Sequence, residues 1–179
     1  MVDWLKLYDK YYNDNKALYD LLLTHSRCVA DKALDVLKRH PEIQADAAFV
    51  EEAAMLHDIG IFLTDAPPIH CFGKHPYIAH GYLGAELMRK EGLPRHALVC
   101  ERHTGTGLSK EEIIAREIPV PHIDMRPRST EEVLICYADK FFSKTRPTEE
   151  KSPDGVECSL AKFGEEGILQ FRKWHKIFG

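Results

Sequence analysis

Four histidines and two aspartates of this 179-residue chain lie within, or at the edge of, apolar runs with helical spacing. They are His25 in LLLTHSRCVA, His57 and Asp58 in AAMLHDIGIF, His80 in HGYLGAEL, His103 in ALVCERH and Asp139 in LICYADKFF. Burying imidazoles and carboxylates costs free energy unless they share a partner. Ordinary core hydrogen bonds explain any one of them alone, but the whole set favours one or two divalent cations. Such a histidine-rich ligand set favours Fe, Mn, Co, Ni or Zn over Mg or Ca.

The elements that must position these residues are helical almost throughout. Apolar side chains recur at three- and four-residue spacing, as Leu18, Leu21 and Leu22 do, and capping boxes begin helices at Ser109 and Ser129. We predict roughly seven helices, over residues 15–40, 46–60, 80–92, 94–103, 109–118, 129–144 and 158–179, the last as one helix or two. Because strand alternation and hairpin signatures are missing, the sequence predicts an all-α fold.

Length and composition limit the class of protein. A chain of 179 residues suits one domain, assigned to residues 1–179, with a motif core at about 20–145 and a helical extension at 158–179. The net charge of −4 argues against a nucleic-acid partner. No apolar run is long enough for a bilayer, the N-terminus lacks a secretory signal, and the five cysteines contain no CxxC pair. These features predict a cytoplasmic protein with no membrane partner.

The order of these residues along the chain resembles a known family. His25, the adjacent His57 and Asp58, and the distal Asp139 match the H…HD…D signature of the HD-domain metal-dependent phosphohydrolases, in the branch that spells it HDIG. The resemblance covers roughly residues 20–145. HGYLGAEL and ERHTGTG are similar to segments of HD proteins that carry two further histidines and hold a dinuclear centre. Bacterial hydrolases that cleave diadenosine tetraphosphate symmetrically are of this kind.

The resemblance implies a role for each matching residue. His25, His57, Asp58 and Asp139 would hold a first metal ion, His80 and His103 a second, and Asp58 would bridge the two. Asp58, His103 and Lys140 would be catalytic. Many HDIG proteins continue with lysine, whereas this chain has Ile61, so the cation that meets substrate must come from elsewhere. The substrate-binding candidates are Arg102, Thr104, Lys144 and Arg146.

The implied fold is a single HD-type helical bundle, and the implied activity is hydrolysis of a nucleotide or dinucleoside polyphosphate by a metal-activated water. The cofactor would be a divalent transition metal, two ions in the dinuclear case, and the partner a small phosphorylated molecule. Neither a Walker A nor a Rossmann glycine pattern occurs to suggest another route.

Two other functions remain open at this level. The set of four histidines and two aspartates also resembles the ligand set of HD-fold di-iron oxygenases, which cleave a carbon bond with O₂. Alternatively, the chain is a non-catalytic HD module that binds nucleotide without turnover. The apolar faces of DWLKLYDKYY and FRKWHKIF pack either on the core or on a second copy of the chain. A homodimer is therefore also an open alternative.

Overall fold

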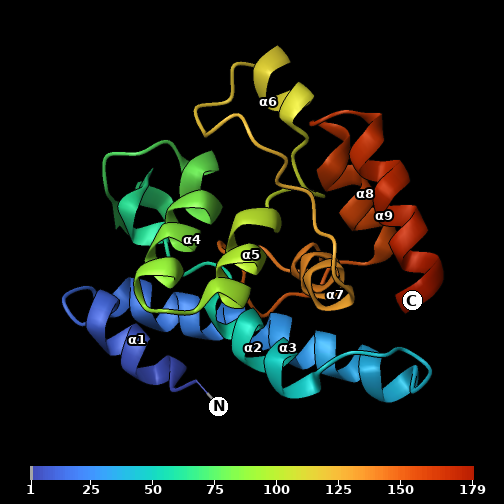
Figure 1. Ribbon diagram of the computed structural model, residues 1–179, viewed down its shortest axis with the longest axis horizontal. Coiled ribbons are helices and arrows are strands. Elements are labelled where there is room, and N and C mark those ends of the chain that lie inside the picture. Colours follow the sequence, from blue (N-terminus) through green and yellow to red (C-terminus); the bar gives the residue numbers. More distant parts are fainter. Residues whose placement is uncertain (1) are drawn as a thin grey trace.

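The computed structural model describes residues 2–179, and within this range nine α-helices account for most of the regular structure (Figure 1). The predicted all-α fold class is confirmed. The helices are α1 (Trp4–Tyr12), α2 (Lys16–Arg39), α3 (Ala47–Leu56), α4 (His80–Lys90), α5 (Pro94–Arg102), α6 (Lys110–Ala115), α7 (Thr130–Asp139), α8 (Pro153–Ala161) and α9 (Glu165–Phe178). The number of helices exceeds the predicted seven because α1 forms in addition and the C-terminal segment divides into α8 and α9.

Helices α2 and α3 pack against each other, as do α4 and α5, and α7 contacts both pairs. Two main apolar clusters hold them together. One joins α2, α3 and α7 to the C-terminal helices, and the other joins α1, α2, α4 and α5. The apolar face of α9 lies in the first cluster, where the Phe171 and Phe178 rings pack on Tyr137. That face of the C-terminal segment therefore packs on the core of its own chain.

Helix α1 closes the molecule beside the HDIG turn. Its N-cap is Asp3, whose side chain accepts from the Lys6 amide. The buried Tyr8 hydroxyl donates to the Met55 carbonyl at 2.7 Å, and the Tyr12 hydroxyl donates to the Ile59 carbonyl at 2.6 Å. These two bonds satisfy one carbonyl in the last turn of α3 and one in the HDIG turn that follows it. The N-terminal segment thus supports the turn that carries the central aspartate.

The expectation of no hairpin was wrong for one short element. Residues Asp65–Ala66 (β1) and Cys71–Phe72 (β2) pair antiparallel within the loop after the HDIG turn. A 3-10 turn at Pro67–Ile69 and a left-handed His70, with φ of 62°, make the connection between them. Two-residue strands are too short to show alternation, so the sequence pattern missed them.

Several helices end earlier than their periodicity predicts. Helix α3 ends at Leu56 with His57 as its C-cap, α5 ends at Arg102 with His103 as its C-cap, and α7 ends at Asp139. The C-terminal extension begins earlier than predicted, because Ser152 caps α8 by accepting from the Gly155 amide. Five of the six chemistry-bearing residues therefore lie at helix ends or just beyond them, whereas His25 lies inside α2.

Among residues 2–179, no helix is both long and apolar enough to cross a membrane.

Replacing Gly60 by alanine should destabilise the protein and disturb the start of α4. A Cβ atom at this position would lie 2.2 Å from the Gly84 backbone nitrogen and 2.7 Å from the His80 carbonyl oxygen. Because backbone atoms cannot rotate away, we expect a loss of about 2 kcal/mol of unfolding free energy, as for overpacked cores. Urea denaturation followed by circular dichroism measures this loss.

The matched control is Gly155→Ala. Gly155 lies within α8, and a Cβ atom there makes only ordinary contacts, the nearest at 3.4 Å. We expect this variant to equal the wild type or to gain up to about 1 kcal/mol, because alanine favours helices over glycine. Wild-type stability of Gly60→Ala would contradict the close contact between the HDIG turn and α4.

Candidate metal centre

Six side chains from five helices meet at one buried place. His25 comes from α2, His57 and Asp58 from the end of α3, His80 from the start of α4, His103 from the end of α5 and Asp139 from the end of α7. All six are buried. Their ligand atoms form two groups that share Asp58: His25, His57, Asp58 and Asp139, and separately Asp58, His80 and His103. These are the two groups that the resemblance implies.

The Asp58 carboxylate divides its oxygens between the groups. Its Oδ2 atom lies 3.3 Å from His25 Nε2 and 3.1 Å from His57 Nε2. Its Oδ1 atom lies 3.3 Å from His80 Nε2 and 3.2 Å from His103 Nε2. The Oδ1 atom of Asp139 completes the first group, 3.1 Å from His25 Nε2. One carboxylate is thus placed to contact two ions.

Three of the histidines are oriented by the helical turn just before them. The Nδ1–H groups of His57, His80 and His103 donate to the carbonyl three residues earlier, each at 2.7 Å. At the ends of α3 and α5 these carbonyls have no further partner within the helix, so the rings act as caps. With the proton on Nδ1, the Nε2 atoms of His80 and His103 present lone pairs to the centre, which is the tautomer that binds a metal. The raised pKa of His57 means that a bound cation would first displace a second proton from its Nε2 atom.

Hydrogen bonds within the chain do not satisfy these atoms. His57 Nε2 and both oxygens of Asp58 are buried without a hydrogen-bond partner. His80 Nε2 and His103 Nε2 face each other at 3.0 Å, and with both protons on Nδ1 neither nitrogen can donate. Neighbouring ligand atoms about 3.0 to 3.4 Å apart are expected around ions with bonds of about 2.1 Å. The donor set therefore fits divalent transition-metal ions.

Burial and charge set the protonation of the centre. Burial lowers the pKa of His80 to about 3 and outweighs the nearby Asp58, so this imidazole is neutral. Burial also acts against a charged His57, but Asp58 and Asp139 outweigh it and raise its pKa to about 9. Burial favours a neutral Asp58 carboxyl, yet Lys144 and the imidazoles hold its pKa well below its usual range. The centre therefore carries fixed negative charge on its two carboxylates.

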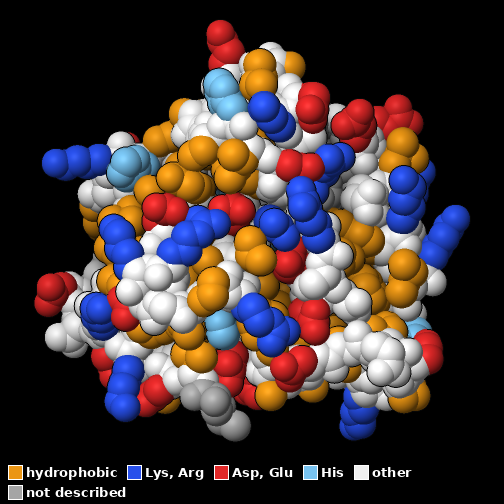
Figure 2. Space-filling view, viewed as in Figure 1, with side chains coloured by type: hydrophobic (Ala, Val, Ile, Leu, Met, Phe, Trp, Pro, Cys, Tyr) orange, Lys and Arg blue, Asp and Glu red, His pale blue; other side chains and the backbone are white. Residues whose placement is uncertain are grey.

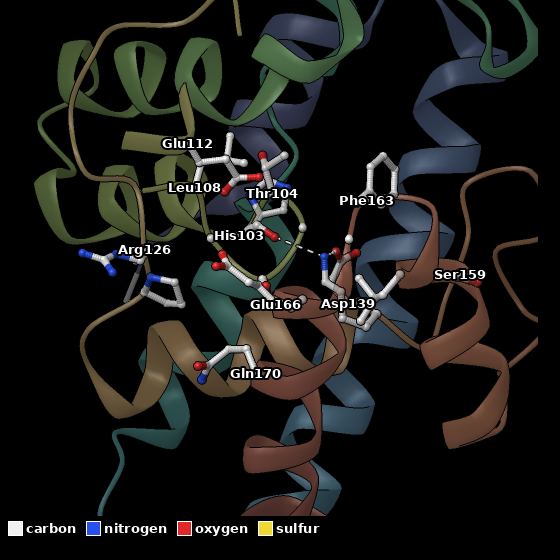
Figure 3. Close-up of a pocket in the computed structure, with 18 of the residues that line it drawn as sticks. His103, Thr104, Leu108, Glu112, Arg126, Asp139, Ser159, Phe163, Glu166 and Gln170 are labelled. Atoms are coloured by element: carbon white, nitrogen blue, oxygen red, sulfur yellow. Dashed lines mark hydrogen bonds and ion pairs between the residues drawn. The ribbon is translucent and has the colours of Figure 1, made fainter. Parts of the chain in front are cut away.

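Two lysines lie against those carboxylates. Lys144 Nζ lies 2.7 Å from Asp58 Oδ2, and Lys140 Nζ lies 2.8 Å from Asp139 Oδ2. Lys140 also donates to the His103 carbonyl at 3.1 Å (dashed line, Figure 3). By contrast, Ile61, at the place of the HDIGK lysine, is buried in an apolar cluster. Lys140 and Lys144 thus place positive charge beside the two carboxylates, where this chain has Ile61 in place of the HDIGK lysine.

The centre opens into a cleft of about 1500 Å³. His80, His103 and Asp139 line its inner part, together with Lys140, Lys144 and Thr104. The loop at 104–109 and the segment at 116–128 form one wall, and α8 and α9 form the other. Figure 2 shows lysine and arginine side chains gathered on this face between α6 and the C-terminal helices.

Two of the predicted substrate residues lie outside this cleft. Arg102 is mostly buried and its Nη1 atom lies 2.9 Å from Glu132 Oε2, which also accepts from the Arg128 amide at 2.8 Å. Arg146 pairs with Glu149 at 3.0 Å and its side chain is 71% exposed. Neither belongs to the cleft lining. Arg102 is therefore placed to hold the segment before α7, through Glu132.

The sequence reasoning missed the contribution of the C-terminal helices to the cleft. Lys151, Phe163 and Trp174 line its outer part, beyond the motif core at 20–145. No local pattern marks them as cleft residues, because their position depends on how α8 and α9 pack on α7. Only the predicted amphipathic character of this segment indicated that one of its faces would be buried.

Asp58→Ala should release both metal ions, whereas His80→Ala should release one and keep the fold. The reason is that Asp58 belongs to both ligand groups and His80 to one. Elemental analysis of each purified variant, with circular dichroism as the folding check, measures the number of ions per chain. His122→Ala is the control, since His122 is exposed and outside both groups. Two ions retained by His80→Ala would refute the second group.

Arg102→Met should lower the unfolding free energy by about 3 kcal/mol, because it leaves the buried Glu132 carboxylate without its charged partner. Metal content should equal that of the wild type. Chemical denaturation and elemental analysis test both statements. Wild-type stability combined with weaker substrate binding would show instead that Arg102 meets substrate.

Comparison with curated proteins gives relatives from archaea. A protein of Thermoplasma volcanium named tRNA (cytidine(56)-2′-O)-methyltransferase is 29% identical over 159 residues, which is 88% of this chain and 42% of that protein. One of the same name from Picrophilus torridus is 31% identical over 71% of this chain and 33% of that protein. An uncharacterized protein of Methanocaldococcus jannaschii is 35% identical over 59% of this chain and 56% of its own length. The chain thus spans about half or less of these relatives.

Among solved structures, the HD domain of the L. monocytogenes phosphodiesterase PgpH is similar, with a TM-score of 0.57 over 91% of this chain and 84% of that one. At 22% sequence identity this likeness concerns the fold. The sequence pattern of the HD domain matches residues 22–143, more than half of the chain and the range that contains all six ligands. The chain therefore belongs to the HD domain family.

Proposed function

We propose that this chain hydrolyses a phosphoester or phosphoanhydride bond of a nucleotide or dinucleoside polyphosphate, using two divalent transition-metal ions. The observation that carries the proposal is the Asp58 carboxylate, whose two oxygens face two separate ligand groups at the inner end of the cleft. Divalent ions held there would lower the pKa of a bound water and polarise a phosphoryl oxygen. His25, His57 and Asp139 would hold one ion with Asp58, and His80 and His103 the other.

The protein's own contribution is to orient and to supply charge. The backbone carbonyls before His57, His80 and His103 fix the rings, so that little reorganisation is needed when the centre is filled. Lys140 and Lys144 place two ammonium groups at the same end of the cleft, where they would stabilise negative charge on phosphoryl oxygens. Thr104 lines the cleft directly after His103 and is a further candidate contact to phosphate.

The ligand set alone does not separate a hydrolase from a di-iron oxygenase of the same fold. The two lysines favour the hydrolase, because a cleft with cations beside its metal ligands suits a phosphorylated substrate. A non-catalytic nucleotide-binding module is disfavoured by Asp58 Oδ1 and His57 Nε2, which are buried without a hydrogen-bond partner. Burying such atoms costs stability, and a module that only binds nucleotide has no need of them.

The names of two relatives raise methyl transfer to tRNA as a further possibility. Those names describe proteins more than twice as long as the matched segment. Within residues 2–179 the sheet consists of two short strands, so the described residues offer no parallel sheet with a glycine-rich turn of the Rossmann kind. Because this chain spans only 42% and 33% of those proteins, we do not assign their methyl transfer to this segment. RNA-derived phosphoesters join the panel of substrates to be tested.

The test is phosphate or nucleotide release by metal-loaded protein, measured on a chromogenic phosphodiester, nucleoside polyphosphates, dinucleoside polyphosphates and an RNA oligonucleotide. We expect Lys140→Met to lower kcat by about a hundredfold, as loss of one preorganised charge-stabilising group does, with both ions retained. Lys90→Met, at the exposed end of α4, is the control and should behave as wild type.

Oxygen uptake is measured in parallel. Oxygen consumption coupled to substrate loss, without phosphate release, would contradict the hydrolase and favour the oxygenase. Tight nucleotide binding without turnover by protein that holds both ions would favour the binding module.

A further inference from the structure

The cleft continues well beyond the metal centre. Its outer part is lined by residues 151–174, in α8, α9 and the segments that flank α8, and the HD domain match ends at residue 143. A volume of about 1500 Å³ exceeds the roughly 300 to 1,000 Å³ of typical small-ligand sites. This outer part is therefore particular to the C-terminal helices and has room for substrate groups distant from the reacting phosphate.

One aromatic ring stands exposed at this corner. Phe163 lies in the turn between α8 and α9, lines the cleft and is 58% exposed. In Figure 3 its ring lies on the Asp139 side of the cleft, away from Arg126. The next residue, Gly164, is the N-cap of α9 and has a φ of 114°, a conformation that glycine adopts without strain. A flat ligand group stacked on Phe163 would bury this surface.

The same corner carries lysines without a carboxylate partner. Among the described residues, no acidic oxygen lies within ion-pair distance of Lys151, Lys162 or Lys173, in contrast to Lys140 and Lys144. Lys151 Nζ donates to the Lys140 carbonyl at 3.3 Å, which ties the corner to the metal centre. Lys162 Nζ lies 5.4 Å from the centroid of the Phe163 ring. Glu165 and Glu166, at the start of α9, also line the cleft but form no ion pair with these lysines. Lysines without an ion-pair partner next to an exposed ring suit a ligand that is aromatic and anionic.

We infer that the corner between α8 and α9 is a nucleoside polyphosphate subsite, in which the base stacks on Phe163 and the phosphates remote from the reacting bond contact Lys151 and Lys162. This inference rests on the proposed function, because it takes the reacting phosphate to lie at the metal centre.

The number of exposed rings at the corner favours a nucleoside polyphosphate over a nucleic-acid strand. Single-strand binding sites repeat stacking rings and cations along a groove. At this corner Phe163 is exposed, whereas Trp174 is buried.

The experiment is calorimetric binding to metal-loaded protein with two non-hydrolysable probes. One is an ATP analogue with methylene phosphate bridges, and the other is the same triphosphate without its nucleoside. Phe163→Ala should lower the affinity for the nucleotide probe about tenfold or more, as loss of one stacking partner does. Its affinity for the base-free probe should be unchanged. Phe163→Tyr should restore binding. The double variant Lys151→Met, Lys162→Met should bind both probes with lower affinity, and its binding should depend less on salt concentration.

Phe72→Ala is the matched control, because Phe72 is 72% exposed and lies outside the cleft lining. The subsite would be overturned if Phe163→Ala bound the nucleotide probe as tightly as the wild type, or if Phe72→Ala lost as much affinity as Phe163→Ala. It would also be overturned if the wild-type protein bound the two probes with equal affinity. Preference for a single-stranded oligonucleotide over the ATP analogue would also overturn it. The proposed function is tested separately by hydrolysis of the chromogenic phosphodiester, so its failure is distinguishable from that of the subsite.

Discussion

The carboxylate of Asp58 is fully buried, and five cationic or imidazole groups surround it at 2.7 to 3.3 Å. An isolated charge in such a place would cost several kcal/mol, so the fold is organised to bring compensating groups to it. Helices α2, α4 and α5 each deliver one imidazole, and the end of α3 delivers His57 together with the carboxylate. The loop after α7 delivers Lys144. The relative positions of these helices are therefore tied to one buried charge.

Close backbone packing makes this convergence possible. A side chain at Gly60 or at Gly81 would collide with the backbone of α4 or α5, so glycine lets the HDIG turn, α4 and α5 approach one another. The tyrosine hydroxyls of α1 satisfy carbonyls of α3 and of the turn. His57 and His103 lie at helix C-termini, where backbone carbonyls are left free to orient their rings. Geometry at the centre thus depends on backbone contacts as much as on the ligands.

The sequence allowed prediction of the helices and of the six grouped ligands, since both follow from local spacing and from an ordered motif. It did not reveal that Arg102 pairs with Glu132, because that partner lies thirty residues away and depends on how α5 packs against α7. Nor did it place Phe163 or Lys151 in the cleft, because residues of α8 and α9 reach it only through tertiary packing. The β1–β2 hairpin was missed because each strand has two residues.

The measurement that tests the central claim most directly is the metal content of the wild-type chain, purified without chelator and without a histidine tag. Two ligand groups that share Asp58 predict close to two transition-metal ions per chain by elemental analysis. Absence of bound metal, even after reconstitution with Mn, Fe, Co, Ni or Zn, would contradict the account. The buried imidazoles, carboxylates and lysines would then satisfy one another, and the cleft would need a different chemistry.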